Sequence, residues 1–218
     1  MPWLEQLRLT PWRQMSCIGL GAYILGCFTT GYYLVRLRAG QDIRFLGSGS
    51  VGARNVGRIY GWPSFGVTLA GDFAKGALAV WAVGHFARDY RLMALAMLGV
   101  VTGHVWPVQL RFRGGKGVAT SLGALLVWDY RLAVGFALLF IAAWALLWRR
   151  TVLAGLLAFA VMPVLSIYLD QGGEPARTVC VSILAAVVLL AHTKNLAEEI
   201  TKLAERRELR SNKEHPGL

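Results

Sequence analysis

Two glycine-rich stretches carry basic residues and are the strongest candidates for chemistry. The first runs from Leu46 to Arg58 and reads Leu-Gly-Ser-Gly-Ser-Val-Gly-Ala-Arg-Asn-Val-Gly-Arg. The second runs from Arg111 to Ser121 and reads Arg-Phe-Arg-Gly-Gly-Lys-Gly-Val-Ala-Thr-Ser. Glycines let several backbone N–H groups converge on one anion, and a nearby Arg or Lys adds a charged donor. Each stretch therefore predicts a phosphate-binding loop.

Neither loop belongs to a standard nucleotide-binding motif. The first contains GxGxxG followed by Asp72, but a dinucleotide fold needs a strand before this pattern, and here an apolar segment precedes it. The second is not a Walker A loop, because Leu110 replaces the first glycine and Gly117 replaces the Ser or Thr. It runs directly into an apolar segment, whose helical N-terminus would favour a phosphate. A plain turn or helix start with basic interface anchors remains the structural alternative for both loops.

Several polar residues stand inside apolar stretches or at their ends. Asp72 and Lys75 share one stretch. Ionisable residues within a membrane are functional candidates by default, although a pair that neutralises itself along one helix explains them equally well. His104 lies near the end of another apolar stretch. It is a further functional candidate, and a hydrogen-bonded histidine at the membrane interface is the structural alternative. His192 closes the last stretch and Asn195 follows one helical turn later, so this polar pair can hydrogen-bond a substrate hydroxyl.

The composition indicates a membrane protein. Of the 218 residues, 56% are hydrophobic and 16% are charged, whereas soluble domains carry about 25% charged residues. The net charge of +11 would indicate nucleic acid in a soluble protein. Together with long apolar runs it indicates the cytoplasmic edge of a membrane protein instead, so no nucleic-acid partner is expected. The three cysteines form no CxxC pair, and neither a metal site nor a cofactor is expected.

Seven apolar segments are candidate membrane helices. Segment 118–128 is short for a crossing and would suit a half-helix buried among the others. Sixteen of the 23 Lys and Arg residues fall in the connections on one side, against six on the other, which places the first side in the cytoplasm. The segments are 15–35, 63–85, 91–108, 118–128, 132–148, 151–169 and 178–192.

The expected fold is therefore an all-α polytopic membrane bundle of about seven transmembrane helices. Its N-terminus would lie outside and its C-terminus in the cytoplasm. Residues 1–193 would form the integral membrane domain, and residues 194–218 would form a charged cytoplasmic tail. No feature of the sequence indicates an oligomeric state.

Taken together, these motifs resemble the bacterial integral-membrane acyl-phosphate:glycerol-3-phosphate acyltransferases of the PlsY type. The similarity extends from about residue 15 to residue 200. Residues 47–58 are similar to the family motif GSGNxGATNxxR, and residues 103–120 match GHxxPxxxxFxGGKGVAT nearly residue for residue. Two shorter family motifs, DxxKG and HxxN, are similar to residues 72–76 and 192–195.

The chain also departs from the family pattern. Ser50 and Arg54 replace the usual Asn and Thr of the first motif. After the third motif, Glu198, Lys202 and Ala204 stand where Arg, Gly and Glu are usual, and the stretch 150–153 lacks the usual serine. These changes keep open a paralogue with a changed acceptor or lost activity.

The resemblance implies transfer of a fatty acyl group from acyl phosphate to the 1-hydroxyl of glycerol 3-phosphate. The products would be lysophosphatidic acid and phosphate, in the first step of phospholipid synthesis. The chain would sit among the lipids of the bacterial plasma (inner) membrane, with its active site on the cytoplasmic side. The sequence contains neither a GxSxG nucleophile elbow nor an HxxxxD pattern, so direct transfer without an acyl-enzyme is expected.

Each candidate residue has an expected role. Ser48 and Arg58 would bind one substrate phosphate with the first-loop glycines. Lys116 and the Gly114–Gly117 backbone would bind the second phosphate and stabilise the leaving group. His192 would orient the glycerol hydroxyl with Asn195, or act as a general base. The further expected phosphate-binding residues are Gly47, Gly49, Gly52, Asn55, Gly114, Gly115, Gly117 and Thr120, and the secondary candidates are Asp72, Lys75 and His104.

Two other classes of membrane protein compete with this interpretation. A membrane transporter of a phosphorylated small molecule would suit the intramembrane Asp72 and Lys75. However, both glycine-rich loops lie on one predicted face and no inverted repeat is apparent. A CDP-alcohol phosphotransferase would need clustered aspartates for metal ions, and the five aspartates here are scattered along the chain.

Overall fold

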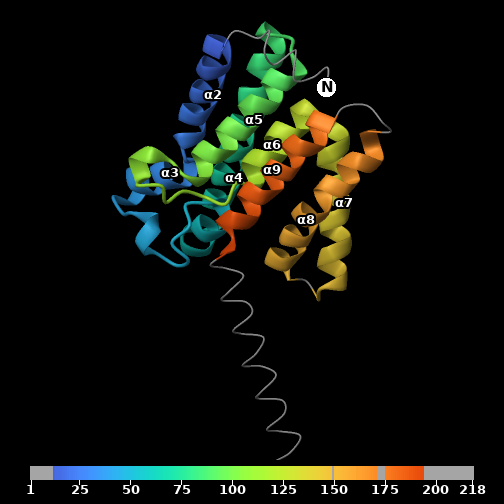
Figure 1. Ribbon diagram of the computed structural model, residues 1–218. Coiled ribbons are helices and arrows are strands. Elements are labelled where there is room, and N and C mark those ends of the chain that lie inside the picture. The colour runs from blue at the N-terminus through green and yellow to red at the C-terminus, as the bar shows by residue number, and fades with distance from the viewer. Residues whose placement is uncertain (1–11, 149, 171–174, 194–218) are drawn as a thin grey trace, which may run out of the picture.

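The computed structural model describes residues 12–148, 150–170 and 175–193, and its regular elements in these ranges are all helical (Figure 1). The expected all-α bundle is therefore confirmed for the described chain, whereas the division at residue 193 concerns a tail that lies outside it. The α-helices are α2 (Trp12–Cys27), α3 (Thr30–Ala39), α4 (Ala53–Phe86), α5 (Tyr90–Val105), α6 (Val118–Trp128), α7 (Tyr130–Leu146), α8 (Thr151–Asp170) and α9 (Pro175–Ala191), and two 3-10 turns are η1 (Ile43–Phe45) and η2 (Val108–Leu110).

Four helical stretches in the described residues are long and apolar enough to cross a membrane. Helices α6, α7 and α9 are apolar but shorter. Helix α6 has 11 residues and is about 16 Å long, roughly half of a hydrocarbon core. It occupies the predicted segment 118–128. The four long stretches are Trp12–Ala39, Ala53–Phe86, Tyr90–Leu110 and Thr151–Asp170.

The first apolar segment, predicted as one helix over 15–35, is broken. Helix α2 ends at Cys27 and α3 begins at Thr30. The amide of Gln109 donates to the carbonyl oxygen of Cys27, and the carboxylate of Asp72 accepts the N–H of Thr30 at 3.2 Å. Backbone polar groups inside a membrane need partners within the protein, and distant side chains supply them here.

Lys75 completes the set of partners at this break. Its ammonium donates to the carbonyl oxygens of Gly26 at 3.2 Å and Phe28 at 2.7 Å. The apolar pattern of residues 15–35 contains no sign of the break, because the groups that stabilise it belong to α4 and to the loop after α5.

Helix α4 starts earlier than the apolar segment 63–85 predicts. It begins at Ala53, so the end of the first glycine-rich stretch is helical, and it is kinked at Gly61. Gly61 has a φ of +83°, a backbone conformation that glycine adopts at little cost. Pro63 follows in the first turn after the kink, where a missing N–H is tolerated. The apolar pattern marks only the part of α4 that follows this kink.

Close helix crossings hold the bundle together. A Cβ atom at Gly76 of α4 would collide with the carbonyl oxygen of Thr120 in α6, and one at Gly123 of α6 would collide with that of Phe73 in α4. Helices α2 and α5 cross in the same way at Gly26 and Gly103. Small residues that let backbones touch are typical of packing between membrane helices. The crossing of α4 and α6 brings the two glycine-rich regions, which precede these helices, to the same part of the molecule.

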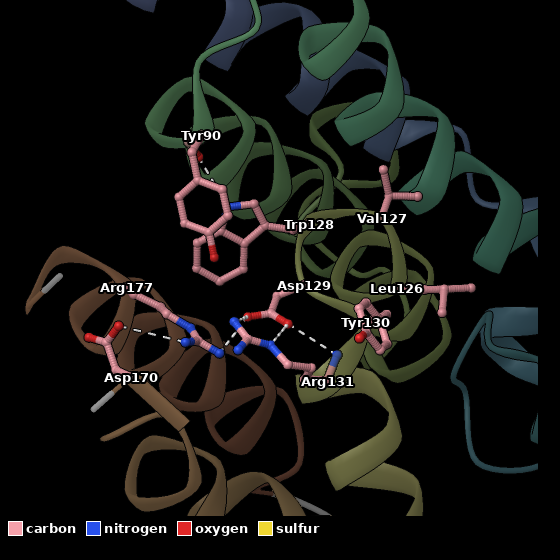
Figure 2. Close-up of a pocket in the computed structure, with 9 residues that line it drawn as sticks. All are labelled: Tyr90, Leu126, Val127, Trp128, Asp129, Tyr130, Arg131, Asp170 and Arg177. Atoms are coloured by element: carbon pink, nitrogen blue, oxygen red, sulfur yellow. Dashed lines mark hydrogen bonds and ion pairs between the residues drawn. The ribbon is translucent and has the colours of Figure 1, made fainter. Parts of the chain in front are cut away.

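At the upper end of the bundle in Figure 1, ion pairs connect α9 with the α6–α7 junction and with α8 (Figure 2). The buried guanidinium of Arg177 pairs with Asp129 and lies 3.7 Å from Asp170. Arg131 also pairs with Asp129, at 3.1 Å, but its side chain is 52% exposed. Beside these residues is an open cavity of about 580 Å³ whose wall includes Tyr90 and Trp128.

Removal of Arg177 is expected to destabilise the protein strongly. The Arg177→Met variant would leave Asp129, which is 8% exposed, without its buried partner. Breaking a buried ion pair costs about 3–5 kcal/mol, which thermal unfolding in detergent measures. The control is Arg131→Met, which removes the exposed partner of the same carboxylate and is expected to change the unfolding temperature little. Equal effects of the two variants would contradict this view of Arg177.

Candidate active site

A cavity of about 470 Å³ lies at the other end of the bundle. Its wall combines the first loop with α4, the second loop with α6, and residues of α7, α8 and the chain after α9. These loop regions are the ones that the charge pattern placed together on one side, and the structure brings them together. The candidate residues in the wall are Ser48, Gly52, Asn55, Arg58, Asp72, His104, Lys116, Gly117 and His192.

The first loop is held in shape by a buried amide. Gly47 and Gly49 have φ angles of +57° and +71°, which allow the chain to turn tightly. The side chain of Asn55 accepts the N–H of Ser48 at 2.9 Å and donates to two carbonyl oxygens of the loop, each at 2.9 Å. The amide of Asn55 therefore fixes the loop that carries Ser48 into the cavity wall.

The N-terminus of α4 faces the same cavity. Gly52 caps the helix, and the hydroxyl of Ser50 accepts the N–H of Gly52 at 3.2 Å. Serine can make this turn contact as asparagine can, so the change from the family pattern at position 50 keeps an acceptor for the turn. Ala53 and Arg54 of the first turn line the cavity. Unpaired N–H groups of a helical first turn favour an anion.

The glycines of the second loop are divided between two tasks. The N–H groups of Gly114 and Gly115 donate to the carbonyl oxygens of Val105 at 3.1 Å and His104 at 3.0 Å. They bind the end of α5, and they are not directed at an anion in the cavity. The prediction that the whole Gly114–Gly117 backbone surrounds one phosphate therefore holds for its last part at most.

The cavity is reached by the last part of this loop and by the start of α6. Gly117 has a φ of +81° and caps α6. Together with Lys116, Val118 and Ala119 it lines the cavity. The N-terminus of α6 and Lys116 thus line the same cavity as the N-terminus of α4.

The cavity wall carries an excess of positive charge. Arg54, Arg58 and Lys116 contribute cations, whereas the carboxylate of Asp72 is paired with Lys75 at 3.0 Å. Two helical N-termini and three cations suit two phosphate groups. From the sequence, Arg54 was noted only as a departure from the family motif, and its basic charge beside Asn55 was the signal that it contributes to this wall.

The ring of His192 has a defined orientation. Its Nδ1 atom lies 2.8 Å from the carbonyl oxygen of Val188. A carbonyl oxygen can only accept, so Nδ1 donates, and in the neutral ring Nε2 is left as an acceptor. An acceptor nitrogen at the cavity wall can bind the proton of a hydroxyl group.

Some candidate residues do not reach the cavity wall. Thr120 and Lys75 are buried beside it, and Asn195 lies outside the described residues. Those that are described but absent from the wall are Gly47, Gly49, Lys75, Gly114, Gly115 and Thr120. The Nζ atom of Lys75 lies 2.8 Å from Nδ1 of His104. Lys75 therefore contacts a residue of the wall without lining the cavity itself.

A hydroxyl and an apolar part of the cavity wall were not predicted from the sequence. Thr151 at the start of α8 lines the cavity and offers a hydroxyl near Leu153, where the family usually has serine. Apolar side chains from four helices extend the cavity away from the cations, toward α7 and α8. The hydropathy pattern of these helices does not distinguish this surface from one that faces lipid. Its residues are Phe65, Leu69, Val118, Leu122, Phe136, Phe140, Val152 and Gly155.

Arg44 connects the two loops. Its guanidinium donates to Asp42 and, at 2.8 Å, to the carbonyl oxygen of Leu110. Beneath this contact is a small buried cluster formed by Val35, Ile43, Val51, Val56 and Leu110. The separation of the loops is therefore set by the hydrogen bond from Arg44 to Leu110 and by a shared apolar core.

The Asp42→Asn variant is expected to loosen this connection in a pH-dependent way. The pKa of Asp42 is lowered from 3.8, mainly because the side chain of Arg44 hydrogen-bonds its carboxylate. A lowered pKa stabilises the fold fully above the unfolded value and loses that effect as the pH falls through the folded value. The variant should unfold more easily than wild type by about 1 kcal/mol at neutral pH.

Thermal unfolding of both proteins, followed as the pH is lowered, measures this effect. The difference between them should be full above the unfolded value of 3.8 and should disappear as the pH falls through the lowered pKa of Asp42 in the folded protein. A difference that persists in full at lower pH would show that the charge of Asp42 is not its origin.

The apolar helices and the basic cavity are those of a membrane protein with a site suited to phosphate groups, and comparison with known proteins gives the family. The family model described as glycerol-3-phosphate acyltransferase matches residues 16–202. The chain belongs to the glycerol-3-phosphate acyltransferase family. Glycerol-3-phosphate acyltransferase 1 of Desulfitobacterium hafniense (strain Y51) is 44% identical over 188 residues, which cover 86% of this chain and 92% of the relative. The glycerol-3-phosphate acyltransferase of Syntrophotalea carbinolica is 37% identical over 180 residues, with coverage of 81% and 89%.

The fold is also that of a solved membrane protein. The crystal structure of PlsY (YgiH), an integral membrane glycerol 3-phosphate acyltransferase, in its glycerol 3-phosphate form matches with a TM-score of 0.76. The two proteins are 30% identical, and the match covers 86% of this chain and 92% of the other. The lysophosphatidic acid form of the same protein matches with a TM-score of 0.72 at 29% identity.

Proposed function

We propose that this protein transfers a fatty acyl group from acyl phosphate to the 1-hydroxyl of glycerol 3-phosphate. The observation that carries the proposal is the meeting of two helical N-termini and three cations at one cavity that continues into an apolar wall. The polar part suits two phosphate groups, and the apolar part suits a fatty chain. The names of the relatives and of the solved structure support the acceptor.

The chemistry requires positioning more than activation. Acyl phosphate is a mixed anhydride, so its carbonyl carbon is already reactive. The oxygen of the glycerol hydroxyl forms the new ester bond to this carbon, the bond from the carbon to the phosphate oxygen breaks, and inorganic phosphate leaves with the proton of the hydroxyl. Holding both reactants in the correct geometry can supply up to about 7–11 kcal/mol of the barrier in ideal cases. The main electrostatic task is to hold two anions close together despite their repulsion.

The residues divide this work between the two loops. Ser48 and Arg58 bind the phosphate of glycerol 3-phosphate together with the N-terminus of α4. Lys116 and the N-terminus of α6 bind the phosphate of the donor and stabilise it as it leaves. The Nε2 atom of His192 accepts a hydrogen bond from the glycerol hydroxyl and orients it, and Asn195 assists. No acyl-enzyme forms, and neither a metal ion nor a cofactor is needed.

The protein is proposed to work in the bacterial plasma (inner) membrane. Seven helical crossings would place the N-terminus outside and the cavity and C-terminus in the cytoplasm. The connections predicted on the same side as the two loops, the tail included, carry 16 of the 23 Lys and Arg residues, as the cytoplasmic side of a membrane protein does. The acyl chain would lie between Phe136, Phe140 and Gly155, beside the bilayer from which it comes.

Acyl transfer to radiolabelled glycerol 3-phosphate tests the proposal directly. The purified full-length protein in lipid is given palmitoyl phosphate, palmitoyl-CoA or palmitoyl-acyl carrier protein, without added metal. Lysophosphatidic acid formed from palmitoyl phosphate alone is the expected result. Product from a thioester donor would overturn the choice of donor. No product from any donor in well-folded protein would overturn the proposed activity and favour a changed acceptor, consistent with the added cation of Arg54.

A further inference from the structure

We propose that Asp72 and Lys75 are positioning residues that fix the proton of His104, and that His104 thereby presents an N–H donor to a phosphate in the cavity. The inference rests on the proposed acyl transfer for its kinetic consequences. It begins from a buried cluster of three ionisable side chains, in which Asp72 is 2%, Lys75 5% and His104 3% exposed.

The cluster is closely connected. The Nζ atom of Lys75 lies 3.0 Å from Oδ1 of Asp72 and 2.8 Å from Nδ1 of His104. The same ammonium also donates to the carbonyl oxygens of Gly26 and Phe28, so its three N–H groups serve four acceptors and one N–H is shared between two of them. A buried cation needs such a set of acceptors to offset the loss of water. The position of Lys75 is therefore fixed from both sides, by the helix break and by Asp72.

The contact with Lys75 determines which nitrogen of His104 carries the proton. An ammonium group has only donors, so Nδ1 of His104 must accept and the proton must lie on Nε2. Asp72 does not compete for Nδ1, because its carboxylate oxygen lies 3.6 Å away, beyond hydrogen-bond distance. Asp72 thus holds Lys75, and Lys75 sets the tautomer of His104.

The protonated nitrogen lies at the second glycine-rich loop. A Cβ atom at Gly115 would collide with Nε2 of His104, so the ring lies directly against this glycine. The carbonyl oxygen of His104 also accepts the N–H of Gly115 at 3.0 Å. His104 lines the cavity together with Lys116. Its Nε2–H group therefore lies against the glycine that directly precedes Lys116, the lysine that we assign to the donor phosphate.

The two histidines of the cavity have opposite roles as a result. His104 accepts through Nδ1 and donates through Nε2, whereas His192 donates through Nδ1 to Val188 and accepts through Nε2. A donor is complementary to a phosphate oxygen and an acceptor is complementary to a hydroxyl proton. The cavity thus presents one neutral ring of each kind.

The first test measures the tautomers directly. Nitrogen-15 spectra of the full-length protein, labelled at histidine and held in lipid, distinguish protonated from unprotonated ring nitrogens. The signals are assigned with His104→Gln and His192→Gln. We expect the proton on Nε2 of His104 and on Nδ1 of His192. In Lys75→Met, His104 should become a mixture of tautomers. A proton on Nδ1 of His104 in wild type overturns the proposal, whether or not Lys75→Met folds.

The second test compares two amide substitutions of His104, in order to separate its role as a hydrogen-bond donor from a purely structural role. In His104→Gln the amide N–H can take the place of Nε2–H, whereas in His104→Asn the shorter amide lies near the place of Nδ1. We expect His104→Gln to retain kcat/KM within a factor of about three, and His104→Asn to lose about 10- to 100-fold. His85→Gln is the control, because His85 is exposed and does not line the cavity. Equal losses in the glutamine and asparagine variants, both well folded, overturn the proposal.

The outcome remains informative if the proposed activity is wrong. Binding of inorganic phosphate to wild type and to the two His104 variants is measured without any acyl donor. Weaker binding in His104→Asn than in His104→Gln supports the donor role even when no acyl transfer occurs. Equal binding in all three proteins, with the expected tautomer, overturns the assignment of His104 to a phosphate and leaves the acyl-transfer assay unaffected.

Discussion

The Lys116→Ala variant is expected to lower kcat for acyl transfer by about two to three orders of magnitude. Lys116 lies at the cavity wall directly before Gly117, which caps α6. Negative charge grows on the leaving phosphate as its bond to the acyl carbon breaks. A fixed cation beside a helical N-terminus stabilises this charge more in the transition state than in the bound donor, so the effect falls on kcat.

Steady-state rates with saturating acyl phosphate and glycerol 3-phosphate measure this change. Arg113→Ala is the matched control, because it removes a charge from the same loop at an exposed residue outside the cavity wall. Lys116→Arg keeps the charge with a different shape and should fall between the two. A Lys116→Ala protein with the kcat of wild type would remove Lys116 from the mechanism.

The Arg58→Ala variant is expected to raise KM for glycerol 3-phosphate about 10- to 100-fold, with a smaller effect on kcat. Arg58 lies one turn after Asn55 in α4 and lines the cavity with Ser48. A hydrogen bond to a charged group contributes about 1.5–3 kcal/mol, and the glycerol phosphate does not change its charge during the reaction. The lost interaction is therefore equal in the ground state and the transition state.

Initial rates over a range of glycerol 3-phosphate concentrations separate KM from kcat. Arg38→Ala is the control, since Arg38 is an exposed residue in the last turn of α3 and does not line the cavity. Ser48→Ala should also lose most of its activity, because Ser48 faces the same phosphate. A pure loss of kcat in Arg58→Ala would move Arg58 to the donor phosphate.

Local signals in the sequence predict the elements around the second loop well. Segment 118–128 matches α6 from Val118 to Trp128, because Gly117 directly precedes an apolar run and the polar Asp129 ends it. The break between α2 and α3 could not be predicted in this way. Its backbone groups are bound by Lys75 and Gln109, which are distant in sequence, and a hydropathy pattern contains no information about such partners.

In the candidate site, the sequence predicts which residue types are present but not the direction in which their backbone N–H groups point. Basic and polar residues in glycine-rich loops predicted a large part of the cavity wall, since charge and glycine content are local properties. The direction of each N–H group is not local. Gly114 and Gly115 bind α5 instead of the cavity because the carbonyl groups of His104 and Val105 lie beneath them. Thr151 was missed for a related reason, since the packing of α8 against α7 and α9 brings the residue to the wall.

The length of α7 has a consequence for the surrounding membrane. The helix has 17 residues and is about 26 Å long, a few ångströms shorter than a typical hydrocarbon core of about 30 Å. Its outer face exposes Val134, Leu138 and Ile141. In the proposed topology of seven crossings, lipids that meet this face would have to compress, at an elastic cost that rises with the length of their chains. Under the proposed function the protein also selects acyl chains for new lipids, so its chain preference affects the bilayer thickness to which its own α7 must adapt.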